Sequence, residues 1–135
     1  MGDDLNILQL VGRFEAALTK RSWARIRGLF LDDARIESVA AGIQALGPDE
    51  TVAAMRSAAE GGIYTLGPWT TETLGPDVAI VYSRMRHHVA KGAITDEGLY
   101  WLMTRRGDLF WRVRIFRDRA AAVACLAERG PSLGL

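Results

Sequence analysis

Cysteine and histidine are scarce in this sequence, and their scarcity excludes several kinds of chemistry. There is one cysteine, Cys125, so no disulfide can form within the chain. A single free thiol is typical of reducing compartments, and we expect a cytoplasmic location. The two histidines, His87 and His88, are adjacent. Neighbouring residues of a strand point to opposite faces, so this pair does not form a shared metal site.

Recognisable cofactor patterns are missing as well. No spacing of His, Cys, Asp and Glu matches a structural or catalytic zinc site. No glycine-rich phosphate loop is present, and no serine lies in the Gly-x-Ser-x-Gly context of a serine hydrolase. The sequence therefore predicts neither a metal nor another cofactor.

The net charge is small, and long apolar runs are absent. The formal net charge is +1, which creates no global field for nucleic acid or an anionic membrane. No apolar run approaches the ~18 residues of a membrane span. The chain opens with acids at Asp3 and Asp4 rather than with the basic segment of a signal peptide. We therefore expect neither a membrane nor a nucleic acid as partner.

Arginine is concentrated in the second half of the chain, where it could form a basic surface. A nucleic-acid surface would need aromatic residues interleaved in a recognised motif, and none is found. We favour a solvated or subunit-facing sheet surface with arginine stems packed over Trp101. The arginines concerned are Arg84, Arg86, Arg105, Arg106, Arg112, Arg114, Arg117 and Arg119.

What is present indicates one globular domain over residues 1–135, with 49% hydrophobic and 24% charged residues. Three helices are predicted in its N-terminal half from apolar residues that recur with a period near 3.6. Ser22 can cap the second helix, while proline and acids begin the third and glycines end it. The predicted helices are Leu5–Thr19, Trp23–Leu31 and Glu50–Glu60.

Five strands and a last helix complete the prediction. Alternation in the third strand places Val81, Ser83, Met85 and His87 on one face, which we expect to point inward. Asp118 precedes Arg-Ala-Ala-Ala, which predicts a capped helix there. The predicted strands are Ala34–Ala40, Trp69–Leu74, Val78–Ala90, Leu99–Arg105 and a last one that begins at Leu109.

The turn between the last two strands decides which of their residues face the core. A two-residue loop at Gly107-Asp108 would place Arg106 opposite Leu109. One face would then be apolar and belong to the core, and a three-residue loop would exchange the faces. The expected core face carries Tyr100, Leu102, Thr104, Trp111, Val113 and Ile115, and the other face carries Trp101, Met103, Arg112 and Arg114.

Two segments resemble the nuclear transport factor 2-like superfamily, in particular its SnoaL-like branch. RFEAALTKRSWARIRGLFLDDARIES (residues 13–38) is similar to the paired opening helices of that family, and GDLFWRVRIFRDRAAAVACLA (residues 107–127) to its closing strand. The resemblance implies an α+β fold: a cone-shaped, curved, mixed or antiparallel sheet packed against three N-terminal helices, with a short C-terminal helix. It also implies a pocket for a small organic ligand, although the fold hosts enzymes and non-catalytic binders alike.

The resemblance allows the sites of ketosteroid isomerase, the best-known enzyme of this fold, to be compared with this chain. Its oxyanion-hole tyrosine falls on Phe14, and its catalytic carboxylate falls on Ser38. Its protonated aspartate falls on Trp101 or Leu102. Enolisation needs a carboxylate base and hydroxyl donors. We therefore reject that chemistry for this chain.

Three residues are candidates for acid/base catalysis without a metal. Asp118 resembles the acid/base aspartate of SnoaL-like polyketide cyclases, although a helix cap is the favoured interpretation. His87 is expected mid-strand, deep in the cone, where an imidazole could transfer a proton near neutrality. Glu37 could form a carboxylate pair with Asp118, or it could be a solvent-facing strand residue.

These observations leave three functions open: a SnoaL-like protein that binds a mostly apolar ligand, a metal-free cyclase, isomerase or hydrolase, and a structural or partner-binding domain with a filled cavity. A homodimer through the outer sheet face is expected, because Trp101, Met103 and Phe116 would form a bare apolar patch there. The expected pocket-lining residues are Phe14, Leu18, Trp23, Phe30, Ser38, Met55, Val81, Ser83, Met85, Tyr100, Leu102, Val113 and Ile115.

Overall fold

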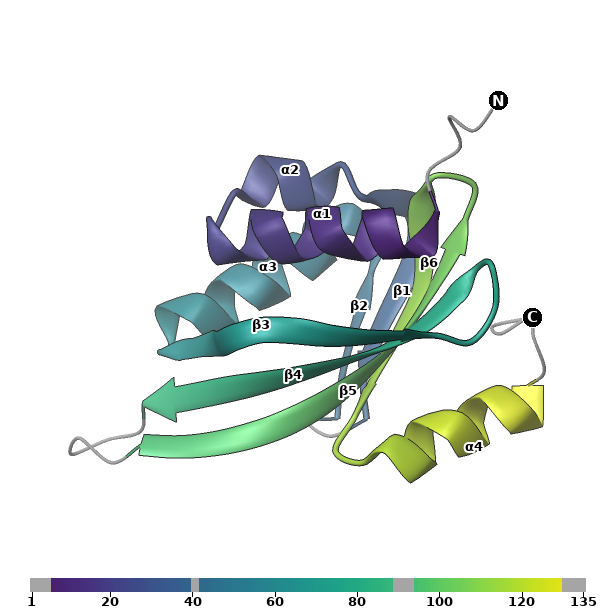
Figure 1. The fold of residues 1–135 in the computed structure, drawn as a ribbon. Coiled ribbons are helices and arrows are strands. Elements are labelled where there is room, and N and C mark those ends of the chain that lie inside the picture. Colours follow the sequence, from purple (N-terminus) through teal and green to yellow (C-terminus); the bar gives the residue numbers. More distant parts are fainter. Residues whose placement is uncertain (1–5, 40–41, 89–93, 130–135) are drawn as a thin grey trace.

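The computed structural model describes residues 6–39, 42–88 and 94–129, and it has the predicted α+β architecture (Figure 1). Three helices lie on one face of a curved sheet, and a fourth helix lies on the opposite face. The elements are α1 (Ile7–Thr19), α2 (Trp23–Arg27), β1 (Phe30–Ser38), β2 (Ile43–Leu46), α3 (Gly47–Glu60), β3 (Ile63–Thr73), β4 (Val78–His88), β5 (Ile94–Arg106), β6 (Leu109–Phe116) and α4 (Arg119–Arg129).

The sheet is mixed, with the strand order β2-β1-β6-β5-β4-β3. β1 and β6 are parallel, and the other neighbouring pairs are antiparallel. The β3–β6 meander follows the chain, whereas β1 reaches β6 through a crossover that includes α3. This topology places the three N-terminal helices over the inner face of the sheet.

The helices begin and end at residues whose chemistry satisfies free backbone groups. Asn6 caps α1 with a reciprocal capping box: its Oδ1 accepts from Gln9 N at 2.8 Å, and its own N donates to Gln9 Oε1 at 2.9 Å. Pro48 lies in the first turn of α3, as predicted, where its missing N–H costs nothing. Ser22 lies at the N-cap of α2, as predicted, but its side chain makes no cap hydrogen bond.

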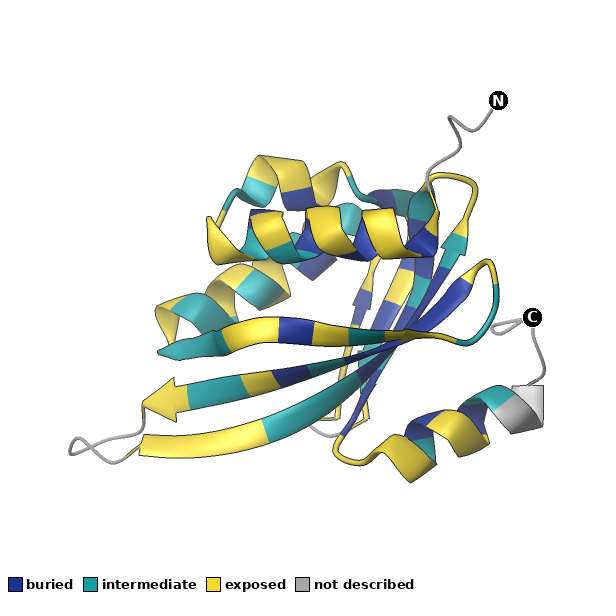
Figure 2. Ribbon diagram, viewed as in Figure 1, coloured by how far each residue is buried: buried dark blue, intermediate teal, exposed yellow. Residues whose placement is uncertain are grey.

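Two apolar clusters lie on opposite faces of the sheet. The inner cluster, between the sheet and α1–α3, is centred on Phe14, which is fully buried and packs against four aromatic rings. The outer cluster lies under α4 and contains Val78, Ile80, Leu102 and Phe116. Figure 2 shows the buried positions along the central strands and on the sheet-facing side of the helices. The chain therefore covers much of the outer face of its own sheet.

The predicted faces of β5 are wrong because of a β-bulge, not because of the turn. Gly107-Asp108 is the two-residue loop, and Arg106 pairs with Leu109 as expected. The register then shifts, since Arg105 pairs with Phe110 whereas Thr104 pairs with Arg112. Trp111 is therefore the extra residue on β6. As a result, Trp101 and Met103 join Val113 and Ile115 on the inner face, and Tyr100 and Leu102 lie on the outer face.

Several element boundaries also differ from the predictions. Phe30 begins β1 instead of ending α2, and it packs into the inner core. The short strand β2 was not predicted, and β3 and β5 begin earlier than expected. Their N-terminal halves contain polar residues or glycine, so alternation alone does not mark them as strands. Residues 5, 40, 89 and 90 of the predicted elements lie outside the described residues. Of the described helices, none combines the length and apolar character that a bilayer crossing requires.

Candidate functional site

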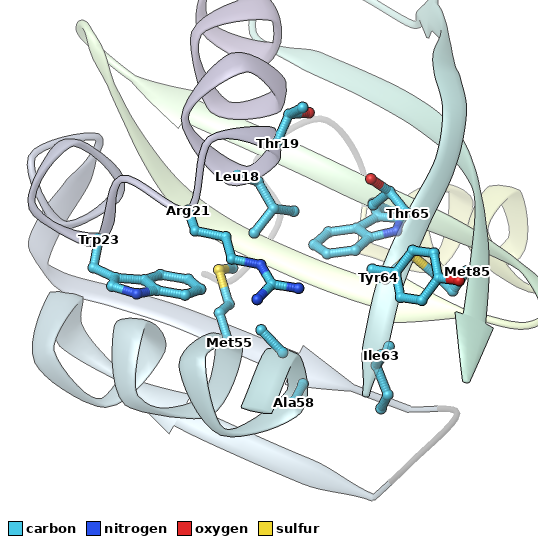
Figure 3. Close-up of a pocket in the computed structure, with 12 residues that line it drawn as sticks. Leu18, Thr19, Arg21, Trp23, Met55, Ala58, Ile63, Tyr64, Thr65 and Met85 are labelled. Atoms are coloured by element: carbon cyan, nitrogen blue, oxygen red, sulfur yellow. The ribbon is translucent and has the colours of Figure 1, made fainter. Parts of the chain in front are cut away.

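A pocket of about 330 Å³ opens between the helices and the inner face of the sheet, at the end where α1 meets the loop to α2 (Figure 3). Its size lies at the lower end of the range of small-molecule sites. Its walls come from the end of α1, the start of α2, the second half of α3, and strands β3, β4 and β5. The lining residues are Leu18, Thr19, Arg21, Trp23, Met55, Ala58, Ala59, Ile63, Tyr64, Thr65, Met85 and Trp101.

The walls are mostly apolar and well fixed. Trp101 is buried, and its Nε1 donates to Ser83 Oγ at 2.8 Å, so the indole plane is held against the sheet. Ring contacts with Phe14 and Trp69 hold the same indole from the other side. Met55 and Met85 are partly buried and provide flexible surfaces on the helix side and the sheet side. This arrangement suits an apolar ligand whose shape the methionines can follow.

Few polar side chains reach this space. Thr19 and Thr65 provide hydroxyl groups, and Arg21 provides the one charged side chain among the lining residues. The lining contains no carboxylate, imidazole or thiol, and its one phenol, that of Tyr64, is hydrogen-bonded to His88 Nε2 at 2.9 Å. In the part of the chain that the structure describes, no three His, Cys, Asp or Glu residues are grouped as metal ligands would be.

Arg21 has an unusual backbone conformation at the edge of the pocket. Its φ of 53° makes it the one non-glycine residue with a positive φ within residues 6–39, 42–88 and 94–129. It occupies the position after the helix cap where glycine is common. Figure 3 shows its side chain extending from the α1–α2 connection into the pocket. Sequence reasoning did not identify this residue, because glycine is the usual sequence signal for a left-handed conformation after a helix and none is present here.

Solved structures with the same architecture show the fold. An NTF2-like protein from Burkholderia xenovorans LB400 aligns with a TM-score of 0.71 and 16% identity, over 87% of this chain and 92% of that one. A ketosteroid isomerase-like protein from Catenulispora acidiphila DSM 44928, in complex with trimethylamine, gives 0.68 and 14%, over 86% and 90%. A candidate polyketide cyclase from Sinorhizobium meliloti gives 0.68 and 17%, over 79% and 93%. The chain has the nuclear transport factor 2-like fold.

Sequence comparison alone does not reach this conclusion. No protein-family model matches the sequence, and no curated protein sequence matches it significantly. The nuclear transport factor 2-like fold inferred from residues 13–38 and 107–127 is nevertheless confirmed by the architecture. At identities of 14–17% the similarity carries the fold and no residue roles.

In this nuclear transport factor 2-like fold, the three predicted catalytic residues lie apart from the pocket lining. His87 is exposed near the end of β4, so its expected position deep in the cone is wrong. Asp118 Oδ1 accepts from Ala121 N at 2.7 Å, which confirms the helix cap. Glu37 forms an ion pair with Arg114, whose Nη2 lies 2.8 Å from Glu37 Oε1. Arg114 also donates to Cys125 Sγ of α4, so Glu37 belongs to the outer face and does not pair with Asp118.

The predicted lining residues divide into four groups. Leu18, Trp23, Met55 and Met85 line the pocket. Tyr100 and Leu102 are misplaced, because the bulge at Trp111 turns them to the outer face under α4. Ser38 lies at the end of β1 and is not among the lining residues. The remaining predicted residues are buried on the inner side of the sheet, without lining the pocket: Phe14, Phe30, Val81, Ser83, Val113 and Ile115.

The sheet residues of the lining that sequence reasoning missed have two causes, the register shift of β5 and the early start of β3. Trp101 was assigned to the outer face, yet it pairs with Val81 and Ile115 and forms the pocket wall. Ile63 and Thr65 lie in the first half of β3, which was not predicted as strand. A strand prediction that began at Ile63 would have placed both on the face of Met85, because Thr65 pairs with Met85.

The outer face near β1 and β6 is basic rather than apolar. The guanidinium groups of Arg106 and Arg112 lie 3.7 and 4.1 Å from the Trp111 ring centroid, so arginine stems cover Trp111 and not Trp101. Burial, followed by repulsion from Arg35, lowers the pKa of the Arg112 guanidinium. The reason given for a homodimer is therefore wrong, because Trp101 and Met103 point inward and Phe116 is covered by α4.

Proposed function

We propose that this protein binds one small, mostly apolar organic molecule in the pocket between α1–α3 and the sheet, without itself catalysing a reaction. The observation that carries this proposal is the composition of the lining. Trp, Met, Leu and Ile side chains dominate the lining of an open space of about 330 Å³, and Tyr64, the one lining side chain that can exchange a proton, has its hydroxyl hydrogen-bonded to His88 Nε2 at 2.9 Å. Such a space with a few polar groups is the general form of a ligand site.

A metal-free acid/base enzyme is the second candidate, and its support is weaker. His87 is exposed, Asp118 caps α4, and Glu37 is paired with Arg114. General acid/base catalysis requires a group within hydrogen-bond reach of the substrate. None of the three lines the pocket, so catalysis there would depend on the Tyr64 hydroxyl, which is already hydrogen-bonded to His88 Nε2.

The third candidate, a structural domain with a filled cavity, is disfavoured by the open volume. Thr19, Thr65 and Arg21 border that volume, and a space filled by the chain's own side chains would leave no room beside them. The trimethylamine complex of the Catenulispora acidiphila protein also supports a ligand-binding role for this fold. That protein is only 14% identical to this chain, so its complex supports ligand binding in general and does not indicate which ligand this chain binds.

The decisive experiment fills the pocket and asks whether an apolar probe is excluded. Ala58 lines the pocket from α3, whereas Ala53 is exposed on the same helix and does not. Titration with the fluorescent dye N-phenyl-1-naphthylamine should saturate at one molecule per chain. Ala58→Trp should abolish that binding, and Ala53→Trp should retain it. Equal binding by both variants, or no saturable binding by the wild type, would contradict the proposal.

Two further proposals concern the molecule in the cell. A homodimer is retained as a proposal without its original basis, and sedimentation equilibrium should give twice the monomer mass of 14.8 kDa if it is correct. A cytoplasmic location follows from the single thiol, and fractionation of the source cells tests it.

A further inference from the structure

The end of helix α1 delivers an arginine into the pocket by a conformation that arginine rarely adopts. Ser22 N donates to Ala17 O at 2.8 Å, and Arg21 N donates to Leu18 O at 3.0 Å. These are the two bonds of a Schellman motif, in which Arg21 takes the left-handed position. Glycine is preferred there because a Cβ is crowded at positive φ. An arginine at φ 53° therefore lowers the stability of the folded state, and an interaction of its side chain would be needed to offset this cost.

The Arg21 side chain has no partner within the described part of the chain. It forms no hydrogen bond, ion pair or ring contact there, although most arginines of the sheet half do. The pocket lining provides no carboxylate to neutralise it. Figure 3 shows the guanidinium group reaching from the α1–α2 connection toward the interior, over the helix that carries Met55 and Ala58. Arg21 is exposed, so one positive charge lies at the open mouth of an otherwise uncharged, mostly apolar space.

We propose that the ligand is an amphipathic monoanion, an apolar body carrying one carboxylate that pairs with Arg21. This inference rests on the proposed function, because it specifies the ligand of the same pocket. A guanidinium is a planar fork that matches a carboxylate with two parallel hydrogen bonds. A dianion such as a phosphate monoester would call for a second positive charge, and Arg21 is the one charged side chain of the lining. The apolar body would lie among Trp23, Trp101, Met55 and Met85.

A different role for Arg21 must be distinguished from this one. A basic residue after the last turn of a helix also interacts favourably with the free carbonyl groups and the helix dipole. Lys20 is the neighbouring basic residue, lies at the cap of α1, and does not line the pocket. It provides a matched control, because Lys20→Ala removes one positive charge from the same helix end without changing the pocket.

The test compares pairs of probes that differ only in charge. Calorimetric titration at neutral pH would use 2-naphthoate with 2-naphthamide, and decanoate with decanamide. The wild type should bind each carboxylate roughly 10-fold more tightly than its amide, the usual size of a charge-assisted hydrogen bond at a partly exposed site. Arg21→Gly should remove the preference, because the carboxylate loses its charged partner. Arg21→Lys should retain part of it, and Lys20→Ala should retain all of it.

Stability separates the binding role from a structural one. Arg21→Gly should raise the melting temperature by about 2–5 °C, because glycine relieves the left-handed conformation. A loss of stability in that variant would indicate that Arg21 serves the helix end, and would overturn the inference. Equal affinities for carboxylate and amide in the wild type would also overturn it, while leaving the proposed function in place. Failure of all four probes to bind would contradict the proposed function as well.

Discussion

Trp101 Nε1 donates a 2.8 Å hydrogen bond to Ser83 Oγ across the β4–β5 pair, and both residues are buried. This bond fixes the indole that forms the sheet-side wall of the pocket. It also satisfies a donor that the surrounding apolar core could not satisfy. The relationship connects the stability of the core with the shape of the pocket.

Ser83→Ala should therefore destabilise the protein. The change leaves the Trp101 indole N–H buried without a partner, which costs about 1–3 kcal/mol. Urea unfolding measures this loss. In the background Trp101→Phe, which removes the donor, Ser83→Ala should cost much less. Equal costs in both backgrounds would show that the hydrogen bond makes no contribution.

Phe14→Ala should be among the most damaging single substitutions. The Phe14 ring is fully buried and lies 5.4–5.8 Å from the ring centroids of Phe30, Trp69, Trp101 and Phe110. Emptying such a site costs about 3–5 kcal/mol. Leu8→Ala is the control, since Leu8 on the same helix is 50% exposed and should cost less than about 0.5 kcal/mol. Similar melting temperatures for the two variants would contradict this packing.

Asp118→Ala should lower stability and leave the pocket unaffected. The substitution removes the acceptor of the Ala121 N–H at the start of α4, a loss of about 1 kcal/mol. Asp118→Asn keeps an acceptor oxygen and should lose less. Binding of N-phenyl-1-naphthylamine should be the same in all three proteins. A loss of dye binding in Asp118→Ala without a matching loss of stability would show that Asp118 contributes to the ligand site.

Asp96 provides a prediction about acid. Hydrogen bonds from Arg86, whose Nε and Nη2 lie 2.8 and 3.0 Å from the carboxylate oxygens, hold the pKa of Asp96 below its ordinary value of 3.8. A carboxyl group with a lowered pKa stabilises the folded state above its unfolded pKa, and this contribution is lost as pH falls through the folded pKa. The stability difference between wild type and Asp96→Asn should thus be constant above about pH 5 and shrink below pH 3.8.

The measurement for Asp96 is a series of urea unfolding curves between about pH 6 and pH 2.5. Asp108→Asn is the matched control, because Asp108 is exposed and forms no ion pair among the described residues. Its difference from the wild type should show little change over the same range. A pH-independent difference for Asp96→Asn would mean that the Arg86 pair does not persist in solution.

The sequence by itself determined the order of the elements and the general position of the core. The helical period of Ile7, Leu10 and Phe14 required one buried face, and Asp118 before a run of alanines required a helix start. Local rules of this kind act within a few residues, so they can be read from the chain. They predicted four of the lining residues: Leu18, Trp23, Met55 and Met85.

The tertiary structure alone decided which face of β5 borders the pocket and which charge enters it. The bulge at Trp111 arises where β5 and β6 pair, and one extra residue reverses every side chain of the neighbouring strand relative to the turn. Trp101 became the pocket wall for this reason. Arg21 adopts its left-handed backbone where α1 ends, which places its exposed side chain at the mouth of the space between α3 and β3–β5. Strand register and the side of the pocket that a residue lines depend on segments distant in sequence, so no local pattern specifies them.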